Sequence, residues 1–237
     1  MSTQYTFTDP SKLYADIDPQ SQDQKEPGLD AELTPKAKLG EDTYVGTERL
    51  KGRKALITGA DSGIGAATAI AFAREGASVA MSYLPEEKVD ADRIAGILRE
   101  AGATVVQIPG DLREREYART LVKEAVEGLG GLDIVVNNGG KQIFNEDVTT
   151  LSDEQFDDTF KTNVYAMFWI CKEAVPHLAP GSTIINTTSI QAYSPAPILV
   201  DYASTKSTIN TFTKALGQQL APKGIRVNAV APGPIWT

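Results

Sequence analysis

The sequence predicts a single α/β domain, built on a doubly wound parallel sheet with helices on both faces. From residue 52 onward, short apolar runs alternate with longer amphipathic stretches, a pattern typical of β-α-β units and a parallel sheet. Gly76, Gly102, Gly130 and Gly224 stand just beyond four of the amphipathic stretches, where a helix commonly ends in a left-handed residue. A chain of 237 residues is long enough for one substantial core of this kind.

The alternation assigns the elements in order along the chain. The run Ala55-Leu56-Ile57-Thr58 is continuously apolar before its last residue, as expected of a buried strand, and an alanine-rich helical stretch follows it. We expect strands at residues 54–58, 78–83, 104–108, 133–136, 182–187 and 226–229. We expect helices at residues 63–74, 86–101, 113–129, 152–177 and 202–221, with or without a bend in the fourth.

Residues 1–46 differ in composition from the domain that we predict at residues 47–237. They are polar and show no sustained period, and they contain Pro10, Pro19, Pro27 and Pro35. Such a segment cannot by itself bury enough apolar surface to offset its ordering entropy. We therefore expect an arm that is disordered or draped on the domain or a neighbouring subunit, and the apolar side chains available for draping are Tyr14, Ile17, Leu29 and Leu33.

Charge and composition exclude several classes of function. The chain has 23 basic and 31 acidic side chains, a net charge of -8, which would repel nucleic acid and anionic membranes. The single cysteine, Cys171, cannot form an internal disulfide, and the single histidine, His177, cannot build a zinc site, so we expect no metal. The first residues lack a basic segment followed by an apolar run, and no stretch is apolar enough to span a membrane. We expect a cytoplasmic protein.

A glycine-rich run follows the first predicted strand and precedes the first predicted helix. Missing side chains there would let backbone N–H groups and the positive end of the helix approach a pyrophosphate. A tight structural turn would also use glycines, so the run alone leaves both interpretations open. The candidate cofactor-binding residues of this run are Gly59, Asp61, Ser62, Gly63, Ile64 and Gly65.

Turns after the third and fourth predicted strands extend this candidate site. Ligands of a doubly wound sheet lie across the carboxyl ends of its strands. Asp111 could accept a hydrogen bond from the adenine amino group, and the turn after the fourth strand could let backbone approach the ribose; ordinary turn chemistry would explain the same residues. The candidates are Asp111, Leu112, Asn138, Gly139 and Gly140.

The second predicted strand should end at the adenosine 2′ position, where an acid favours NAD and a base favours NADP. The residues there are Ser82, Tyr83 and Leu84, with neither an aspartate at the tip nor an arginine just past it. Asp61 adds negative charge nearby, so we favour NAD. Hydrogen bonds from Ser82 and Tyr83 to a phosphate, with Lys88 close in sequence, keep NADP open.

The catalytic candidates are a tyrosine and a lysine one helical turn apart. Tyr202 and Lys206 share one helix face, and a nearby ammonium would lower the pKa of the phenol, which is about 10 in water, toward neutrality. Tyr202 would then serve as general acid in carbonyl reduction and general base in alcohol oxidation. Ser189 stands 13 residues before Tyr202 and would donate to the substrate oxygen as negative charge develops there. An amphipathic helix with a partly buried tyrosine is the structural alternative.

These motifs together resemble the short-chain dehydrogenase/reductase family. The chain matches the pattern T-G-x-x-x-G-x-G at residues 58–65, a variant of N-N-A-G at residues 137–140, S-x12-Y-x3-K from Ser189 to Lys206, and the P-G turn at residues 232–233. It is also similar to an N-terminally extended bacterial subgroup related to glucose and ribitol dehydrogenase homologues, on the residues 26–28, 44–46, 61–65, 82–85 and 232–237. The resemblance covers residues 52–237 and implies a Rossmann-type fold.

The resemblance also implies roles for particular residues. Lys206 would hydrogen-bond the nicotinamide ribose, and Asn163 would hold a proton-relay water as the fourth catalytic residue. Cofactor contacts would extend to Tyr202 and to Pro232, Gly233 and Ile235, and the substrate would meet Ser189, Gln191 and Tyr202. The helices at residues 152–177 and 202–221 would pair across two-fold axes, so the resemblance implies a homodimer or homotetramer.

Two departures from the family pattern stand out. Gly139 replaces the usual alanine, which we expect to loosen the turn after the fourth strand slightly. The sequence stops at Thr237, whereas the resemblance implies a further segment, so we expect a truncated chain whose sheet lacks its C-terminal strand. We predict an oxidoreductase that transfers a hydride between NAD(P) and an aldehyde, ketone, polyol or sugar. The alternative is a nucleotide-binding protein without turnover, either a regulatory subunit or an incomplete chain.

Overall fold

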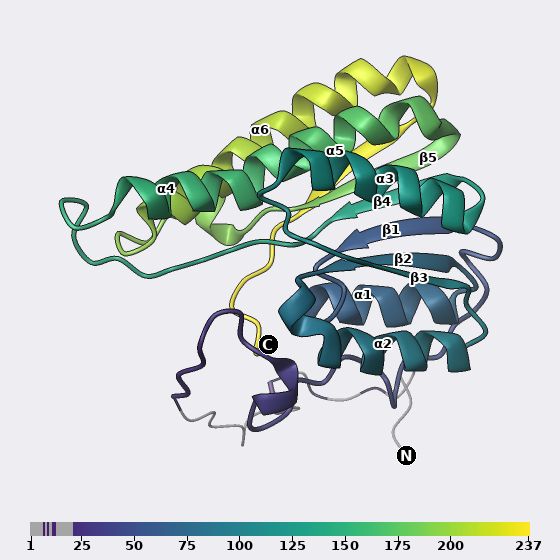
Figure 1. The fold of residues 1–237 in the computed structure, drawn as a ribbon, viewed down its shortest axis with the longest axis horizontal. Coiled ribbons are helices and arrows are strands. Elements are labelled where there is room, and N and C mark those ends of the chain that lie inside the picture. Colours follow the sequence, from purple (N-terminus) through teal and green to yellow (C-terminus); the bar gives the residue numbers. More distant parts are fainter. Residues whose placement is uncertain (1–6, 8, 10, 13–20) are drawn as a thin grey trace.

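The computed structural model describes residues 7, 9, 11–12 and 21–237. Tyr14 and Ile17, which the sequence suggests for draping, lie outside the described residues. Figure 1 shows one layered body in which a central sheet carries helices on both faces. The sequence prediction of a doubly wound α/β fold is confirmed.

The sheet has six strands in the order β3-β2-β1-β4-β5-β6, and every pair is parallel. The strands are β1 (Lys54–Thr58), β2 (Ser78–Tyr83), β3 (Val105–Pro109), β4 (Leu132–Asn137), β5 (Leu178–Thr187) and β6 (Arg226–Val230). The order of the strands reverses between β1 and β4, because β1 to β3 extend the sheet toward one edge and β4 to β6 extend it toward the other. Leu56 of β1 pairs with Val135 of β4 at this point. In sheets of this kind the crevice at this reversal, outside the carboxyl ends of the strands, is the usual ligand site.

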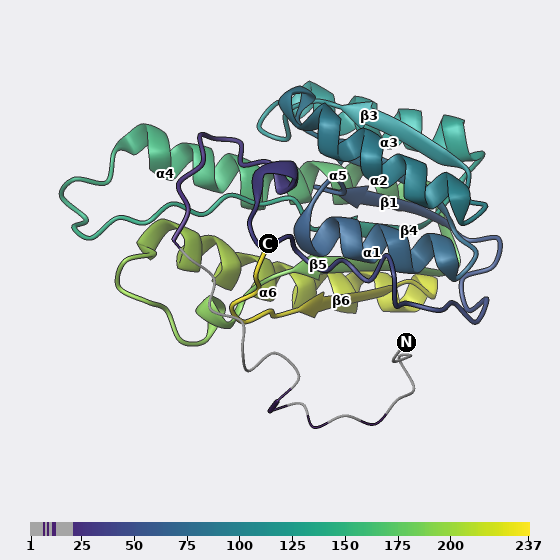
Figure 2. The same cartoon turned by 90° about the horizontal axis from the view of Figure 1, so that it is seen from below.

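Helices cover the two faces of the sheet unequally. Helices α1 (Gly63–Arg74) and α2 (Lys88–Glu100) lie on one face, and α3 (Arg115–Leu129), α5 (Ala166–Ala174) and α6 (Val200–Leu220) lie on the other. Helix α4 (Asp153–Phe160) extends beyond the end of the sheet and is seen at the left of Figures 1 and 2. Short helical turns are η1 (Asp30–Glu32), η2 (Pro85–Glu87), η3 (Lys161–Tyr165), η4 (Val175–His177), η5 (Ile190–Ala192) and η6 (Ala221–Lys223).

The predicted element bounds are met closely at β1, β2 and α1, which begin and end at the expected residues. All four glycines predicted as helix stops have positive φ, between 69° at Gly130 and 90° at Gly76. The predicted helix at residues 152–177 is divided into α4, the π-helical turn η3, α5 and η4. The bend that the sequence left open is therefore located at η3, which carries Asn163.

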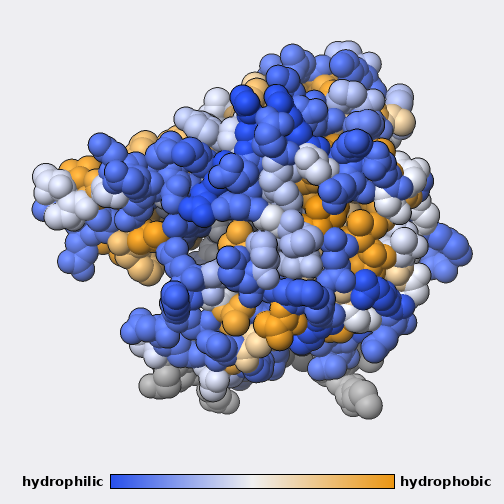
Figure 3. Space-filling view, in the orientation of Figure 1, coloured by the Kyte–Doolittle hydropathy of each residue, from blue (hydrophilic) through white to orange (hydrophobic). Residues whose placement is uncertain are grey.

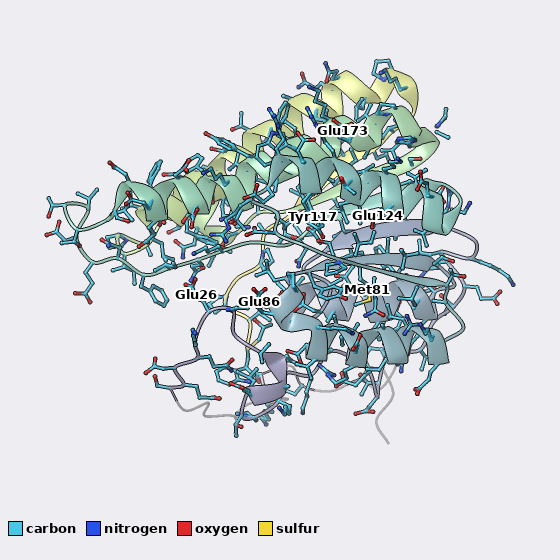
Figure 4. All side chains as sticks on the ribbon, viewed as in Figure 1. Glu26, Met81, Glu86, Tyr117, Glu124 and Glu173 are labelled. Atoms are coloured by element: carbon cyan, nitrogen blue, oxygen red, sulfur yellow. The ribbon has the colours of Figure 1, made fainter. Side chains whose placement is uncertain are left out.

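Each face of the sheet has its own apolar core. One cluster joins Leu56, Val135 and Ile184 to α3, α5 and α6, and the other joins Ile57 and Met81 to α1 and α2. Figure 4 labels a residue on each side: Tyr117 extends from α3 on the first face, and Met81 lies between the sheet and α1 on the second. Packing on both faces buries β1, β2 and β4 up to their carboxyl ends, where the candidate site residues begin.

The described part of the N-terminal arm packs on the α1 and α2 face. Leu33, Ala37 and Leu39 are buried in the same cluster as Ile70 of α1. Further along, the carboxylate of Glu75 accepts hydrogen bonds from Tyr44 Oη, at 2.5 Å, and from the Arg49 side chain, at 2.7 Å. These contacts run the arm along α1, and Figure 2 shows it continuing across the edge of the sheet beside the C-terminal residues.

Candidate active site

The glycine-rich turn between β1 and α1 is closed too tightly to accept side chains. An added Cβ at Gly65 would lie 1.8 Å from the Gly59 carbonyl oxygen, far inside van der Waals contact. Gly59 and Gly63 have φ of 60° and 51°, which other residues rarely adopt. The missing side chain of Gly65 therefore lets the first turn of α1 pack directly against the end of β1, as a pyrophosphate cradle requires.

The turn after β4 is fastened to this cradle by Thr58. Its Oγ1 accepts hydrogen bonds from the backbone N–H groups of Asn138 and Gly139, both at 2.9 Å. An added Cβ at Gly139 would lie 2.7 Å from Leu112 Cδ1, so glycine there makes room for the leucine side chain. The turn that the sequence predicts to be slightly loosened by Gly139 is held by these two N–H bonds to Thr58. Sequence inspection missed this role of Thr58, although the residue opens the glycine motif.

The corner beyond β2 is acidic. Burial raises the pKa of Asp61, whose side-chain hydrogen bond with Ser62 opposes this. Burial, followed by the negative charge of Asp61, raises the pKa of Glu87 to about 7. These carboxyl groups lie where the adenosine 2′ position is expected.

The polar side chains that the sequence suggests for binding the 2′-phosphate of NADP are buried or paired within the chain. Ser82 is 1 % exposed, and its hydroxyl lies 3.0 Å from the Tyr117 hydroxyl, with which it shares a hydrogen bond. Tyr83 is buried, so a ligand could meet these two residues chiefly through their backbone. The Lys88 ammonium forms an ion pair with Asp92, at 2.5 Å.

Asp111, the candidate adenine acceptor, is bound by its own neighbour. The Arg113 guanidinium donates to both carboxylate oxygens of Asp111 and also to Asp158. Asp111 therefore lies at the expected strand end, but its carboxylate is already hydrogen-bonded within the chain.

Lys206 and Tyr202 project from the same face of α6 toward the ends of β4 and β5. The Lys206 ammonium is 5.3 Å from the centre of the Tyr202 ring and donates to the Thr187 carbonyl oxygen at the end of β5, at 2.9 Å. The Thr188 hydroxyl donates to the Lys206 carbonyl oxygen at 2.8 Å, which ties α6 to the same strand end. The lysine is 4 % exposed, so its position is determined by packing.

Ser189 follows β5 by two residues and faces Tyr202. A side-chain hydrogen bond with Ser189 lowers the pKa of Tyr202, but burial, the larger effect, raises it above the usual value of 10. Ser189 Oγ also accepts from the Gln191 N–H at 3.2 Å. The Gln191 side chain accepts from the Ala196 N–H at 2.6 Å and so shapes the loop that follows.

The expected lowering of the Tyr202 pKa by Lys206 is contradicted by the structure. Burial of both side chains opposes charge on each, and it lowers the pKa of Lys206 itself to about 8. The lysine ammonium is bound to the Thr187 carbonyl oxygen, and no lowering of the Tyr202 pKa by Lys206 is found. In the chain alone, burial therefore keeps the phenol protonated.

Asn163 is held in the π-helical turn η3, an irregularity that often marks functional sites. Its Oδ1 accepts from the Lys141 N–H at 2.7 Å, and its Nδ2 donates to the Lys141 carbonyl oxygen at 2.9 Å and to Thr205 Oγ1 at 3.0 Å. Thr205 stands next to Lys206 on α6. Asn163 thus links the loop after β4 to the helix of the catalytic pair.

A small hollow brings most of these groups together. It is lined from the glycine-cradle side by Thr58, Leu112 and Gly139 and from the catalytic side by Asn163, Thr187 and Lys206. An added Cβ at Gly140 would lie 3.2 Å from Asn163 Oδ1 and 3.6 Å from Lys206 Nζ. The residues present therefore fit a dinucleotide whose pyrophosphate meets the cradle and whose nicotinamide end meets Lys206.

The turn after β6 borders this region. The Pro232 carbonyl oxygen accepts from the Ile190 N–H at 3.1 Å, which fixes residues 232–233 beside Ser189. The Ile235 side chain is exposed.

Among the described residues, no group of histidine, cysteine and carboxylate side chains could hold a metal ion. Cys171 is buried, and burial raises the pKa of its thiol to about 12. No helix in the described part of the chain is long and apolar enough to cross a bilayer.

The strand order and the glycine cradle at the reversal point define the class of dinucleotide-binding α/β proteins. Residues 53–237 match the model of the short chain dehydrogenase family, and the chain belongs to this family. It is therefore an oxidoreductase of a class that uses a nicotinamide cofactor and a small-molecule substrate.

Individual relatives agree with this membership. The chain is 53% identical over 229 residues to the uncharacterized oxidoreductase YghA of Escherichia coli, covering 97% of this chain and 78% of that protein. It is 38% identical to glucose and ribitol dehydrogenase of Daucus carota, covering 92% of this chain and 77% of that protein. The crystal structure of a Burkholderia cenocepacia short chain dehydrogenase in complex with NADP superposes with a TM-score of 0.75 at 34% identity, covering 78% and 75% of the two chains.

Proposed function

We propose that this protein transfers a hydride between NAD(P) and a carbonyl or alcohol substrate, an aldehyde, ketone, polyol or sugar. The observation that carries the proposal is the convergence of Tyr202, Ser189 and Lys206 beside a glycine cradle that leaves no room for a Cβ. The similarity to glucose and ribitol dehydrogenase supports a polyol or sugar within this range.

The roles of the side chains follow from their contacts. Tyr202, whose pKa burial raises, gives its proton to the substrate oxygen during reduction and takes it back during oxidation. Ser189 donates a second hydrogen bond to that oxygen as charge develops on it. The bound nicotinamide supplies or accepts the hydride. Lys206, anchored on Thr187, orients the nicotinamide ribose. Asn163, which is hydrogen-bonded to the loop after β4, would hold the proton-relay water.

Of the two cofactors, we favour NAD. Asp61 and Glu87 place carboxyl groups at the adenosine 2′ corner. Burial raises the pKa of both, that of Glu87 to about 7, so the negative charge that would repel a 2′-phosphate there is largest above neutral pH. Lys88, the first residue of α2, is paired with Asp92. The NADP complex of the Burkholderia enzyme is the reason to measure both cofactors.

We further propose a homodimer or homotetramer. Phe156, Tyr165 and Phe168, on α4, η3 and α5, have exposed fractions between 41% and 45%. Figure 3 shows a largely hydrophilic surface with apolar patches at the α4 end of the molecule. Covering such side chains is the usual driving force for subunit association. Size-exclusion chromatography with light scattering would distinguish these assemblies from a monomer.

Turnover assays with NADH and NADPH against aldehydes, ketones and polyols test the proposal. Replacing Tyr202 with phenylalanine should lower kcat by about 100-fold or more, the range for loss of a general acid, while NADH binding, measured by fluorescence, persists. Tyr44→Phe, which removes a hydroxyl bound to Glu75 at the far end of α1, is the control and should retain activity. Undiminished hydride transfer by Tyr202→Phe would refute the role of Tyr202. Cofactor binding by the wild type without turnover of any substrate would favour a binding protein instead.

A further inference from the structure

The N-terminal arm crosses the edge of the sheet at which the candidate site lies. Glu26 pairs with Lys141, in the loop after β4, at 3.2 Å. The Pro35 carbonyl oxygen accepts from Trp236 Nε1, beyond β6, at 2.8 Å. Between these points, η1 meets the first turn of α2. Figures 1 and 2 both show the arm beside the C-terminal residues at this edge, and Figure 4 shows Glu26 and Glu86 on this side of the molecule.

The arm is seated on α2 by Asp90. One Asp90 carboxylate oxygen accepts from the Asp30 N–H at 2.7 Å, and the other accepts from the Ala31 N–H at 3.0 Å. The Asp30 side chain is 6% exposed, and its Oδ2 accepts a hydrogen bond from the Arg93 guanidinium. These contacts fix a carboxylate of the arm at the start of α2, directly after the β2–α2 connection.

Asp30 has an oxygen that no residue in the described part of the chain uses. Oδ1 is buried and has no hydrogen-bond partner among the residues that the structure describes. A buried acceptor of this kind is costly unless something donates to it. Asp61 and Glu87, the other carboxyl groups of the corner, already take part in hydrogen bonds with Ser62 and with the Leu84 N–H. Asp30 is therefore the carboxylate best able to accept a bond from a ligand.

The second strand lacks an acid that proteins of this fold usually have at its end, and Asp30 lies near that end. Proteins with this sheet order usually carry an acid at the end of β2 that accepts from the adenosine ribose, and here that strand ends in buried Ser82 and Tyr83. The negative charge of Asp30 reaches Asp61 in the glycine-rich turn, where it contributes to raising the pKa of that carboxyl. Asp30 thus lies near the adenosine end of the cradle.

We propose that Asp30, supplied by the N-terminal arm, is a cofactor-specificity residue that accepts a hydrogen bond from an adenosine ribose hydroxyl and disfavours a 2′-phosphate. This inference rests on the proposed function, because it needs a bound dinucleotide. It assigns the arm a share in the cofactor site, with Asp90 as the positioning residue that seats it. Arg93 moderates the charge of Asp30 through their ion pair.

The test compares dissociation constants for NADH and NADPH, measured by nucleotide fluorescence with the full chain and no substrate. Asp30→Asn removes the charge and keeps an acceptor, so NADPH should bind about tenfold more tightly, as expected when one like charge close to the 2′-phosphate is removed from a site screened by water and salt. Asp30→Ala removes the acceptor as well, so NADH should bind about tenfold more weakly. Glu32→Ala, an acid on the exposed side of the same turn, should change neither constant more than about twofold.

Arg93→Gln distinguishes recognition of the cofactor by Asp30 from a role of Asp30 only in holding the arm on α2. It removes the main positive charge that offsets Asp30, so the preference for NADH over NADPH should increase or stay the same, opposite to Asp30→Asn. If Asp30 only anchors the arm through Arg93, both variants break the same contact and shift the preference in the same direction, which overturns the proposal. Asp30 variants that match Glu32→Ala in both constants also overturn it. A wild type that binds neither nucleotide refutes the proposed function itself, and the inference with it; thermal unfolding confirms that each variant is folded.

Discussion

Replacing Lys206 with methionine tests how strongly the fold opposes charge on that ammonium. Burial lowers the pKa of Lys206 from 10.5 to about 8, which corresponds to about 3 kcal/mol at about 1.36 kcal/mol per pKa unit. Between these two values the unfolded chain holds a proton that the folded chain has released. The free energy of unfolding therefore rises with pH across this window. Methionine fills a similar volume without a titrating group.

Urea denaturation of the wild type and of Lys206→Met at about pH 7 and pH 9.5 measures the effect. Over this interval the wild type should gain about 2 kcal/mol relative to the variant, because part of the roughly 3 kcal/mol is released only at higher pH. Lys214→Met, on the exposed side of the same helix, should show no such gain, since its ammonium stays in water. Stability curves of the wild type and Lys206→Met that run parallel between these pH values would show that burial does not set the charge of Lys206.

Two further predictions concern the cradle and the arm. Gly65→Ala should lower the free energy of unfolding by about 3 kcal/mol and weaken NADH binding, because its Cβ would lie 1.8 Å from the Gly59 oxygen. Gly96→Ala, in α2 with nothing within 4 Å of the added Cβ, should instead raise it by about 0.5–1 kcal/mol; equal effects in urea denaturation would contradict the role of the cradle. Hydrogen bonds from Arg49 hold the pKa of Glu75 below its usual 4.5, so the wild type should lose stability as pH falls below that value. Glu75→Gln should lack this loss in thermal unfolding between about pH 3 and pH 7.

The sequence was sufficient for the parts of the fold that repeat a local pattern. Strand β1 is an unbroken apolar run and α1 begins directly after the glycines, so their bounds could be predicted to the residue. Strand β5 could not, because Pro180 and Gly181 inside it indicate a turn. The structure includes them, and Leu178 pairs with Leu132 before a shift in register. Tertiary pairing determined where that strand begins.

The positions of the candidate catalytic residues were predictable for a similar reason. Tyr202 and Lys206 are one turn apart on a helix, so their neighbourhood is fixed by spacing alone. The direction of the Tyr202 pKa shift was not predictable, because it depends on how deeply the phenol is buried and on the Thr187 carbonyl that binds the lysine. Neither property follows from the separation of two residues in the sequence.

The arm marks the limit of such reasoning most clearly. Asp30 and Asp90 are 60 residues apart, and the composition of the arm indicated only a polar segment with a few apolar side chains. In the structure, two backbone N–H groups of that segment bind one carboxylate of α2, and this places a second carboxylate beside the acidic corner after β2. The family pattern locates the ribose acceptor on the second strand, where this chain has none. A residue that replaces it from outside the matched residues 53–237 can be found only by asking which buried oxygen still lacks a donor.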